Sequence, residues 1–316
     1  MHASFPGLLW SADLGVQERI GILMSTRERL MLLGAGSMAE ALIKGLLDAR
    51  LLAPEQITIS NRSHPERLAA LQERYGVTIC REKEASIREA TLVVLTVKPF
   101  DVVAALQEIA SFLTPAQLLI SVAAGVSTEA IEQLVRKPVP IIRAMPNTSS
   151  FVRESATALC RGRQATAEHV EIAQRLFSAI GSSVVVDEAL MDAVTGLSGT
   201  GPAYFYYVVE ALMEAGEACG LAPDICRSLL LQTLAGSAKM LQETGEDPAT
   251  LRRQVTSPNG TTMAGIAVLE QGGLKPLFVR AVQRATQRAL EMGQEIHIPS
   301  STGNISSSSL PASKRH

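Results

Sequence analysis

Apolar runs alternate with segments of helical spacing from Leu30 to about Asp187. Runs that are apolar throughout are typical of strands covered on both faces, as in parallel sheets. The runs predicted as strands are residues 30–33, 57–60, 77–79, 92–97, 118–122, 141–144, 156–159 and 183–186. The segments between them, such as 65–74 and 101–113, have helical spacing. The pattern predicts an α/β domain with a doubly wound sheet.

Past Glu188 the strand pattern stops, and only helical patterns follow. Helices are predicted at residues 203–219, from Pro223 onward, and at 229–243, 262–271 and 274–295. The helix at 203–219 is apolar on most sides, so most of its circumference must be buried. A small helical domain cannot bury it alone, and we therefore expect a second copy of the chain to cover it. The alternative is that these helices pack on their own α/β domain.

These patterns divide the chain into four parts. We expect a poorly ordered extension at 1–28, the α/β domain at 29–187, an all-helical dimerisation domain at 188–297, and a disordered, Ser-rich tail at 298–316.

The first predicted strand runs directly into Gly34-Ala35-Gly36-Ser37-Met38-Ala39, and a helical pattern follows at once. A Gly-x-Gly-x-x-Ala motif alone occurs often by chance, but between a strand and a helix it is typical of dinucleotide binding. Gly34 allows a tight turn, Gly36 lets the backbone approach a pyrophosphate, and Ala39 permits close packing of helix on strand. The α/β domain is therefore predicted to be of the Rossmann type.

The second predicted strand ends in Asn61-Arg62-Ser63. Folds selective for NAD commonly place an acid here to hold the ribose 2′-hydroxyl. This chain has a guanidinium and a hydroxyl instead, and the planar fork of Arg62 can pair with a 2′-phosphate through two bonds. We therefore expect NADP(H) to be preferred over NAD(H), which stays the second choice. An ordinary polar turn is the alternative.

Ligands of open α/β sheets bind beyond the carboxyl ends of the strands. Loops at these ends are Thr96-Val97-Lys98-Pro99, Ala123-Ala124-Gly125 and Met145-Pro146-Asn147-Thr148. Lys98 is interpreted as a cofactor contact rather than a general acid. The small residues at 123–125 are expected to let the backbone approach a flat ring.

Two motifs of the helical half are rich in Gly, Ser and Thr, at residues 192–202 and 255–262. The second precedes a helix, where free N–H groups and hydroxyls can bind a carboxylate. Either motif alone could be a well-made helix cap. Together, beside a dinucleotide domain, they favour a small anionic substrate.

Composition limits the other classes of function. Hydrophobic residues make up 47% of the 316 residues and the net charge is −2, so neither a nucleic-acid surface nor a membrane surface is expected. No secretory leader or membrane span is predicted, which favours a cytoplasmic enzyme. The four cysteines are interpreted as small buried hydrophobic residues. No metal site is predicted, since neither cysteines nor histidines have ligand spacing.

From about Leu30 to Glu295 the chain resembles pyrroline-5-carboxylate reductases. The motifs that carry the resemblance are Val-Thr-Gly-Leu-Ser-Gly within 192–204, Ser257-Pro258-Asn259-Gly260-Thr261-Thr262, Val97-Lys98-Pro99 and Met145-Pro146-Asn147-Thr148. The resemblance implies NAD(P)H-dependent reduction of 1-pyrroline-5-carboxylate to L-proline, the last step of proline biosynthesis. It also implies an active site at a dimer interface, and larger rings of dimers.

The resemblance also implies site residues. The cofactor contacts are Gly34, Ala35, Gly36, Ser37, Met38, Asn61, Arg62, Ser63, Thr96, Val97, Lys98, Pro99, Ala123, Ala124 and Gly125. The substrate contacts are Ser257, Asn259, Gly260, Thr261 and Thr262, with Glu188 and Thr195 nearby.

The substrate iminium carbon already accepts hydride, so the protein mainly has to align it with the nicotinamide. We expect the Thr195 hydroxyl, the one catalytic candidate, to hydrogen-bond the ring nitrogen. Alternatively, Thr195 bonds its own helix backbone and water supplies the proton.

Three positions depart from the family pattern. Asn259 replaces a usual glycine, and the loop should survive because Asn tolerates positive φ. Gln254 and Lys83 stand where some members have Asn near the cofactor.

Two other functions remain open. One is another imine reductase or a β-hydroxyacid dehydrogenase, although no lysine of the kind that serves β-hydroxyacid enzymes lies between Glu188 and Tyr204. The other is a non-catalytic NADP(H)-binding sensor.

Overall fold

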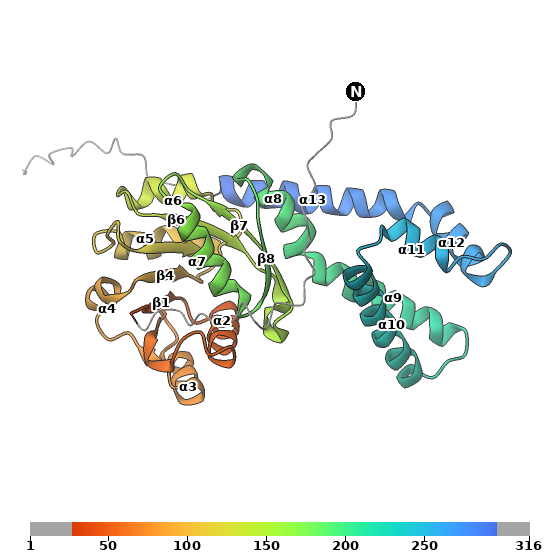
Figure 1. Cartoon of the computed structure of the whole chain (residues 1–316), viewed down its shortest axis with the longest axis horizontal. Helices are drawn as coiled ribbons and strands as arrows, with labels where there is room; N and C mark the ends of the chain where they lie inside the picture. The colour runs from red at the N-terminus through yellow and green to blue at the C-terminus, as the bar shows by residue number, and fades with distance from the viewer. Residues whose placement is uncertain (1–26, 296–316) are drawn as a thin grey trace, which may run out of the picture.

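A computed structural model describes residues 27–295 of the chain. The predicted tail at 298–316 and nearly all of the predicted extension at 1–28 lie outside the described residues. Figure 1 shows an α/β body from which a helical arm extends, with one long helix returning from the arm to the body.

The sheet of the described body has eight strands in the order β3-β2-β1-β4-β5-β6-β7-β8. They are β1 (Leu30–Leu33), β2 (Ile57–Ser60), β3 (Thr78–Ile79), β4 (Leu92–Leu95), β5 (Leu118–Ser121), β6 (Ile141–Met145), β7 (Ser155–Arg161) and β8 (Gly181–Val185). Each predicted strand is confirmed to within a few residues. The order places the change of direction between β1 and β4, where doubly wound folds bind ligands.

Strand β7 departs from the parallel arrangement that the apolar runs favour, because it pairs antiparallel to β6. The two strands are joined only by residues 146–154, which hold the short helix η3 (Thr148–Val152). A parallel pair needs a crossover of a dozen or more residues, so this short connection makes the chain reverse. Strand β8 then returns parallel to β7 through helix α7 (Ala167–Ser178).

Helices cover both faces of the sheet, and each face has its own core. Leu30 and Leu32 of β1 pack with α2 (Ser37–Asp48), α3 (Pro65–Tyr75) and α7. The intervening Met31 and Leu33 pack on the other face, because side chains alternate along a strand. The helices on that face are α4 (Lys83–Glu89), α5 (Val102–Ile109) and α6 (Thr128–Val135).

The helical half begins beside the sheet and continues into the arm. Its elements are α8 (Met191–Val194), the π-helix η5 (Thr195–Gly199), α9 (Gly201–Ala218), α10 (Pro223–Thr244), α11 (Pro248–Gln254), α12 (Thr261–Gln271) and α13 (Leu274–Gln294). The short helices η1 (Pro54–Gln56) and η2 (Pro99–Asp101) lie in the α/β half, and η4 (Glu188–Leu190) opens the helical half. Helix α10 runs unbroken, so the predicted separate helix at 229–243 is only its second part.

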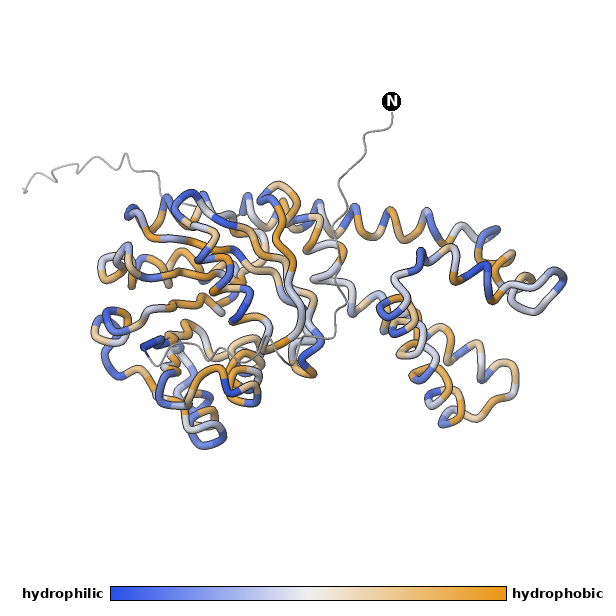
Figure 2. The backbone as a smooth tube through the Cα atoms, in the orientation of Figure 1, coloured by the Kyte–Doolittle hydropathy of each residue, from blue (hydrophilic) through white to orange (hydrophobic). Residues whose placement is uncertain are grey.

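The arm, which consists of α9 to α12 and the adjoining part of α13, has almost no core of its own. Tyr206, Tyr207 and Val268 are 65%, 72% and 67% exposed, and Figure 2 shows hydrophobic segments along α9, α10 and α12. In α9 and α10 together, only Gly201 and Cys226 are buried. The alternative, packing on the chain's own α/β domain, holds for α13, which contacts the loop at Gly125, whereas α9 and α10 do not bury their apolar faces there. Cys219 is also exposed here, contrary to the expectation for all four cysteines.

Within residues 27–295, no helix combines the length and the apolar character needed to cross a bilayer.

Candidate active site

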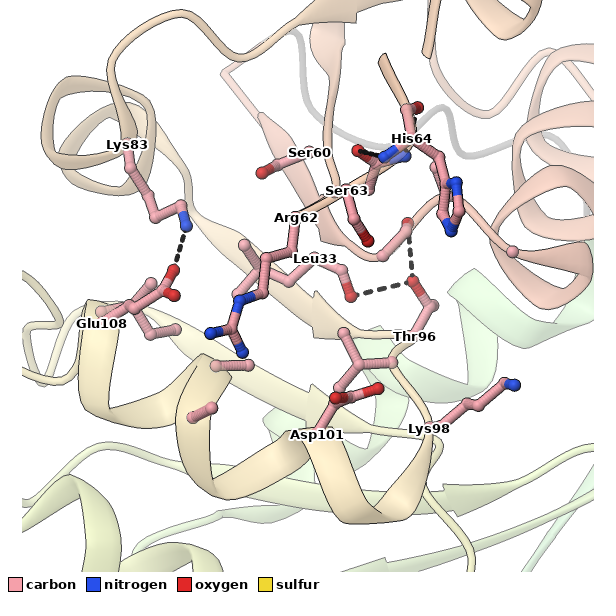
Figure 3. A pocket seen from close by; sticks show the side chains of 18 of the residues that line it. Leu33, Ser60, Arg62, Ser63, His64, Lys83, Thr96, Lys98, Asp101 and Glu108 are labelled. Carbon is pink, nitrogen blue, oxygen red and sulfur yellow. Dashed lines mark hydrogen bonds and ion pairs between the residues drawn. The ribbon is translucent and has the colours of Figure 1, made fainter. Parts of the chain in front are cut away.

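A cavity of about 320 Å³ lies beyond the carboxyl ends of β1, β2 and β4 (Figure 3). We call it the strand-end cavity. It is lined by Leu33, Gly34, Ala35, Gly36, Ser60, Asn61, Arg62, Ser63, His64, Lys83, Thr96, Val97, Lys98, Phe100, Asp101, Ala104, Ala105, Glu108 and Ile109. Three segments far apart in the sequence and predicted to bind cofactor, at 34–36, 61–63 and 96–98, therefore meet here.

The glycine turn of the cavity has a backbone that needs glycine. Gly34 has a φ of +115°, and a Cβ there would lie 2.7 Å from the carbonyl oxygen of Thr96. Thr96 fixes the same turn, since its Oγ1 donates to the carbonyl oxygens of Leu33 at 3.1 Å and Gly34 at 2.9 Å. Gly36 faces open space and begins α2 without a side-chain cap. The first N–H groups of α2 are thus available to an anion.

Arg67 supports this turn from α3, although nothing in the sequence pattern singles it out. Its Nε donates to the carbonyl oxygen of Ala35 at 3.1 Å, and its guanidinium pairs with Glu40 in the first turn of α2. Glu40 also accepts from Arg74 and Tyr75, at 3.0 Å each. Helix α3 is thereby locked against the start of α2.

The turn after β2 divides its tasks among its residues. The Asn61 amide donates to the carbonyl oxygen of His64 at 2.7 Å and accepts from the His64 N–H at 3.2 Å, so this side chain shapes the turn. Arg62 and Ser63 are exposed and line the cavity. Figure 3 shows the Arg62 guanidinium extending into it, and no described residue forms a hydrogen bond or an ion pair with that group. Arg62 is free to bind an anionic ligand.

Helix α5 and its approach supply a wall of the cavity that sequence reasoning missed. Phe100, Asp101 and Glu108 lie there, and Glu108 forms an ion pair with Lys83 of α4. The Lys98 Nζ lies 5.7 Å from the centre of the Phe100 ring. Their shared position after the Lys-Pro loop is the only sequence signal that could have identified them.

Six of the predicted cofactor contacts do not line the strand-end cavity: Ser37, Met38, Pro99, Ala123, Ala124 and Gly125. Gly125 has a φ of +75°, and its close neighbour is helix α13 rather than open space. A Cβ at Gly125 would lie 3.0 Å from the carbonyl oxygen of Ala289 and 3.1 Å from the N atom of Gly293. Packing against α13 thus accounts for glycine at this position.

Glu188, predicted to lie near the substrate, belongs to a network centred on the buried Arg143 of β6. Arg143 donates through Nη1 to Glu188 at 2.6 Å and through Nη2 to Asp192 at 3.1 Å. The other Glu188 oxygen accepts from the Oγ1 of Thr128 at 2.8 Å and from the thiol of Cys160 at 3.1 Å. Both carboxylate oxygens are therefore engaged within the chain.

These contacts also set the charge states in the network. Burial raises the pKa of the Glu188 carboxyl, but hydrogen bonds from Arg143, Cys160 and Thr128 outweigh burial and hold it below its ordinary value. Burial and the neighbouring Glu188 carboxylate raise the pKa of the Cys160 thiol. Glu188 thus stays ionised at neutral pH, and Cys160 stays a protonated donor.

Thr195 is 9% exposed and opens the π-helix η5. Its hydroxyl donates to the carbonyl oxygen of Met191 at 2.9 Å, which is the backbone bond given as the alternative to a substrate contact. The hydroxyl proton is therefore engaged, while the oxygen can still accept a hydrogen bond. Single π-helical turns inside longer helices often mark functional sites.

The segment Ser257–Thr262 connects α11 to α12 on the arm, away from the strand-end cavity (Figure 1). Asn259 has a φ of +58°, as expected for the residue that replaces glycine. Gly260 begins α12 without a side-chain cap, Thr261 is exposed and Thr262 is half-buried. Gln254, at the end of α11, is also on the arm. One chain alone does not bring this segment to the cavity.

Among residues 27–295 no cluster of His, Cys, Asp and Glu could hold a metal ion.

Two family models match the chain. One describes pyrroline-5-carboxylate reductase dimerisation and matches residues 188–292. The other describes an NADP oxidoreductase that is coenzyme F420-dependent and matches residues 29–125. The two matches correspond to the helical half and to the part of the α/β body that forms the strand-end cavity.

Solved structures share the whole architecture. A pyrroline-5-carboxylate reductase from Coxiella burnetii aligns with a TM-score of 0.79 at 36% identity, covering 84% of this chain and 99% of the other. The Plasmodium falciparum pyrroline carboxylate reductase, solved with NADP bound, aligns with a TM-score of 0.75 at 27% identity, covering 86% and 99%.

Relatives of similar length agree. Pyrroline-5-carboxylate reductase 1 of Bacillus spizizenii is 39% identical over 85% of this chain and 91% of its own length. The pyrroline-5-carboxylate reductase of Methanosarcina acetivorans is 38% identical over 85% of this chain and 99% of its own length. The likeness extends through both halves of the molecule, and the chain belongs to the pyrroline-5-carboxylate reductase family.

Proposed function

We propose that this protein reduces 1-pyrroline-5-carboxylate to L-proline with NAD(P)H, by hydride transfer to the cyclic imine carbon, as the last step of proline biosynthesis. The observation that carries the proposal is the strand-end cavity, onto which the glycine turn, the start of α2 and Arg62 all open. This arrangement suits a phosphorylated dinucleotide. Relatives 38–39% identical over most of the chain bear the name of this reductase.

The cofactor side of the site fits a dinucleotide on two observations. Gly36 faces open space, and the first turn of α2 has free N–H groups that can bind the pyrophosphate. Arg62 can pair with a ribose 2′-phosphate, which favours NADPH over NADH. When bound, the reduced nicotinamide supplies the hydride.

The substrate side uses the segment at 257–262. The uncapped start of α12 and the hydroxyls of Thr261 and Thr262 can bind the substrate carboxylate. Fixing the carboxylate orients the ring, so that its carbon can face the hydride donor. Thr195 contributes an acceptor oxygen for the protonated ring nitrogen, since its own proton is bonded to Met191.

The two sides meet only if a second chain takes part. The arm carries the substrate segment away from the cavity of its own chain, and its apolar faces are exposed. A homodimer in which each arm reaches the partner's cavity would bury these faces and complete two sites. The family's dimerisation region covers the whole arm.

NADPH oxidation with and without 1-pyrroline-5-carboxylate tests the function directly. Substrate-dependent loss of absorbance with formation of proline is the expected result. Binding of NADPH without turnover would identify a sensor instead. Turnover confined to other imines or to β-hydroxyacids would place the protein in another class of reductase.

Light scattering on the same preparation should show at least a dimer, and it separates a dimer from a ring of dimers. The ring and the cytoplasmic location stay predictions.

A further inference from the structure

The network around Arg143 joins the two halves of the proposed site through hydrogen bonds and ion pairs between residues of the chain itself. Arg143 lies in β6 with its side chain 3% exposed, so its charge is balanced inside the protein. Its two partners, Glu188 and Asp192, lie in η4 and α8, at the start of the helical half. The network therefore lies where the sheet meets the helices.

On one side the network holds the loop at 123–125. Glu188 accepts from both the N–H of Thr128, at 3.3 Å, and its Oγ1, at 2.8 Å. Thr128 is the first residue of α6, which begins three residues after Gly125. A carboxylate at this point binds the positive end of the helix and fixes where the preceding loop lies.

On the other side the network holds Thr195. Asp192, bonded to Arg143, is in α8, which leads directly into η5. Met191 of the same short helix is fully buried, and its carbonyl oxygen accepts from Thr195. A shift of α8 would therefore move Thr195 with it.

Helix α13 closes the frame by a separate route. It packs against the backbone of Gly125, and it also packs against η5. A Cβ at Gly196 would lie 2.5 Å from the Oγ1 of Thr286, so the two helices approach to backbone distance there. The loop and Thr195 are thus tied together twice, by charge at Glu188 and by packing at α13.

We propose that Arg143 and Glu188 are positioning residues, which set the distance and angle between the 123–125 loop and Thr195. The sequence predicts that the loop faces the nicotinamide and that Thr195 contacts the imine nitrogen, so this spacing aligns the hydride donor with the imine. A buried ion pair is weak support for stability alone, because desolvation of both partners offsets much of their attraction. The Nε of Arg143 is also buried without a partner among the described residues, which adds a cost. Geometry accounts better for this network than net stability does.

Glu188→Gln is the decisive variant, because it keeps the size of the side chain and an acceptor oxygen while removing the charge. Glu129→Gln is the matched control, since Glu129 follows Thr128 in α6 but forms an exposed pair with Arg163, at 3.3 Å. The proposal rests on the proposed reduction, so single-turnover loss of NADPH absorbance is measured at saturating 1-pyrroline-5-carboxylate. We expect a rate at least tenfold lower in Glu188→Gln, with NADPH affinity and substrate KM within about twofold of wild type.

Two results would overturn the proposal. If Glu188→Gln keeps the single-turnover rate of the wild type and only its melting temperature falls, the network has a structural role alone. A rise in substrate KM as the main effect would make Glu188 a substrate contact. Arg143→Lys is a second test variant. A lysine keeps the charge but lacks the planar guanidinium that bonds Glu188 and Asp192 at once, so we expect its single-turnover rate to fall in part.

Amide hydrogen exchange separates this inference from the proposed function. In Glu188→Gln the backbone amides of residues 123–130 and 191–199 should exchange faster than in the wild type. They should also exchange faster than in Glu129→Gln. Unchanged exchange in these segments would contradict positioning even if the enzyme is active. A wild-type protein that does not turn over the imine would refute the function while leaving the exchange result to stand by itself.

Discussion

Arg62 enters the strand-end cavity without an anionic partner among the described residues, in contrast to Lys83, which Glu108 neutralises. An unpaired guanidinium in a cavity formed by a dinucleotide motif indicates a ligand with negative charge at that point. The same sequence position carries an acid in folds selective for NAD. A single side chain can therefore decide between the two cofactors.

Arg62→Ala should raise the KM for NADPH about tenfold to a hundredfold and change the KM for NADH little. The reason is the loss of charge-assisted hydrogen bonds to the 2′-phosphate, of about 1.5–3 kcal/mol. Steady-state kinetics with both cofactors check this, with Arg163→Ala as an exposed control outside the cavity. Equal losses with both cofactors would show that Arg62 does not read the phosphate.

Thr195→Val keeps the shape of the side chain and removes its hydroxyl. If the oxygen accepts from the ring nitrogen, kcat/KM should fall about tenfold to a hundredfold while NADPH affinity stays unchanged. Thr262→Ala should instead raise the substrate KM, because it removes a carboxylate contact but leaves the backbone N–H groups. Wild-type kinetics in folded Thr195→Val would leave its hydroxyl with the single task of bonding Met191.

Glu188 makes stability depend on pH in a defined direction. The pKa of Glu188 is lower in the folded state than in the unfolded chain. Its contribution to the free energy of unfolding is therefore complete at pH values above the ordinary carboxyl pKa and is lost as pH falls through the lowered pKa. Melting temperatures of wild type and Glu188→Gln should therefore differ most near neutral pH and converge in acid. A constant difference from pH 7 to pH 3 would contradict this assignment.

At the level of elements, the turn before α12 depends on a left-handed residue. Asn259 has a φ of +58°, a conformation that costs other residues with a Cβ about 1–2 kcal/mol. Asn259→Ala should lower the melting temperature and raise the substrate KM, whereas Asn259→Gly should keep both near wild type. Thermal melts and kinetics of the two variants check this, and equal behaviour would show that the turn tolerates either residue.

The elements that sequence predicts well are those with strong local patterns. The strand at 57–60 has the predicted bounds, because an apolar run between polar turns determines it. The antiparallel direction of β7 could not be predicted in this way, because an apolar run has the same pattern whichever way the strand runs in the sheet. The pattern predicts one helix opening at Pro223 and another at 229–243, but α10 runs through both because no glycine or proline lies between them.

The site follows the same division. The glycine turn and Arg62 are recognisable because their chemistry is local to a short motif. Arg143 lies in an apolar strand, 45 residues before Glu188, and only folding brings the two together. Glu108 and Phe100 likewise line the cavity through packing rather than through any motif.

At the scale of the molecule, shared sites can be tested by mixing two defective chains. Gly34→Val should abolish the cofactor side because its Cβ would meet Thr96, while Thr262→Ala impairs the substrate side. If each site takes its segment at 257–262 from the partner, heterodimers contain one intact site, and co-refolded mixtures should regain activity. Activity no higher than the sum of the two parents would place each complete site within one chain.

The arm that leaves each body with its apolar faces uncovered also affects how the protein persists at low concentration. In the proposed homodimer its helices acquire their interior only on association, so association and completion of the fold are one thermodynamic event. Each tenfold dilution then lowers the free energy holding the folded dimer together by about 1.4 kcal/mol. A newly made chain without a partner is left with an incomplete interior, open to proteases and to aggregation, until another copy is made nearby.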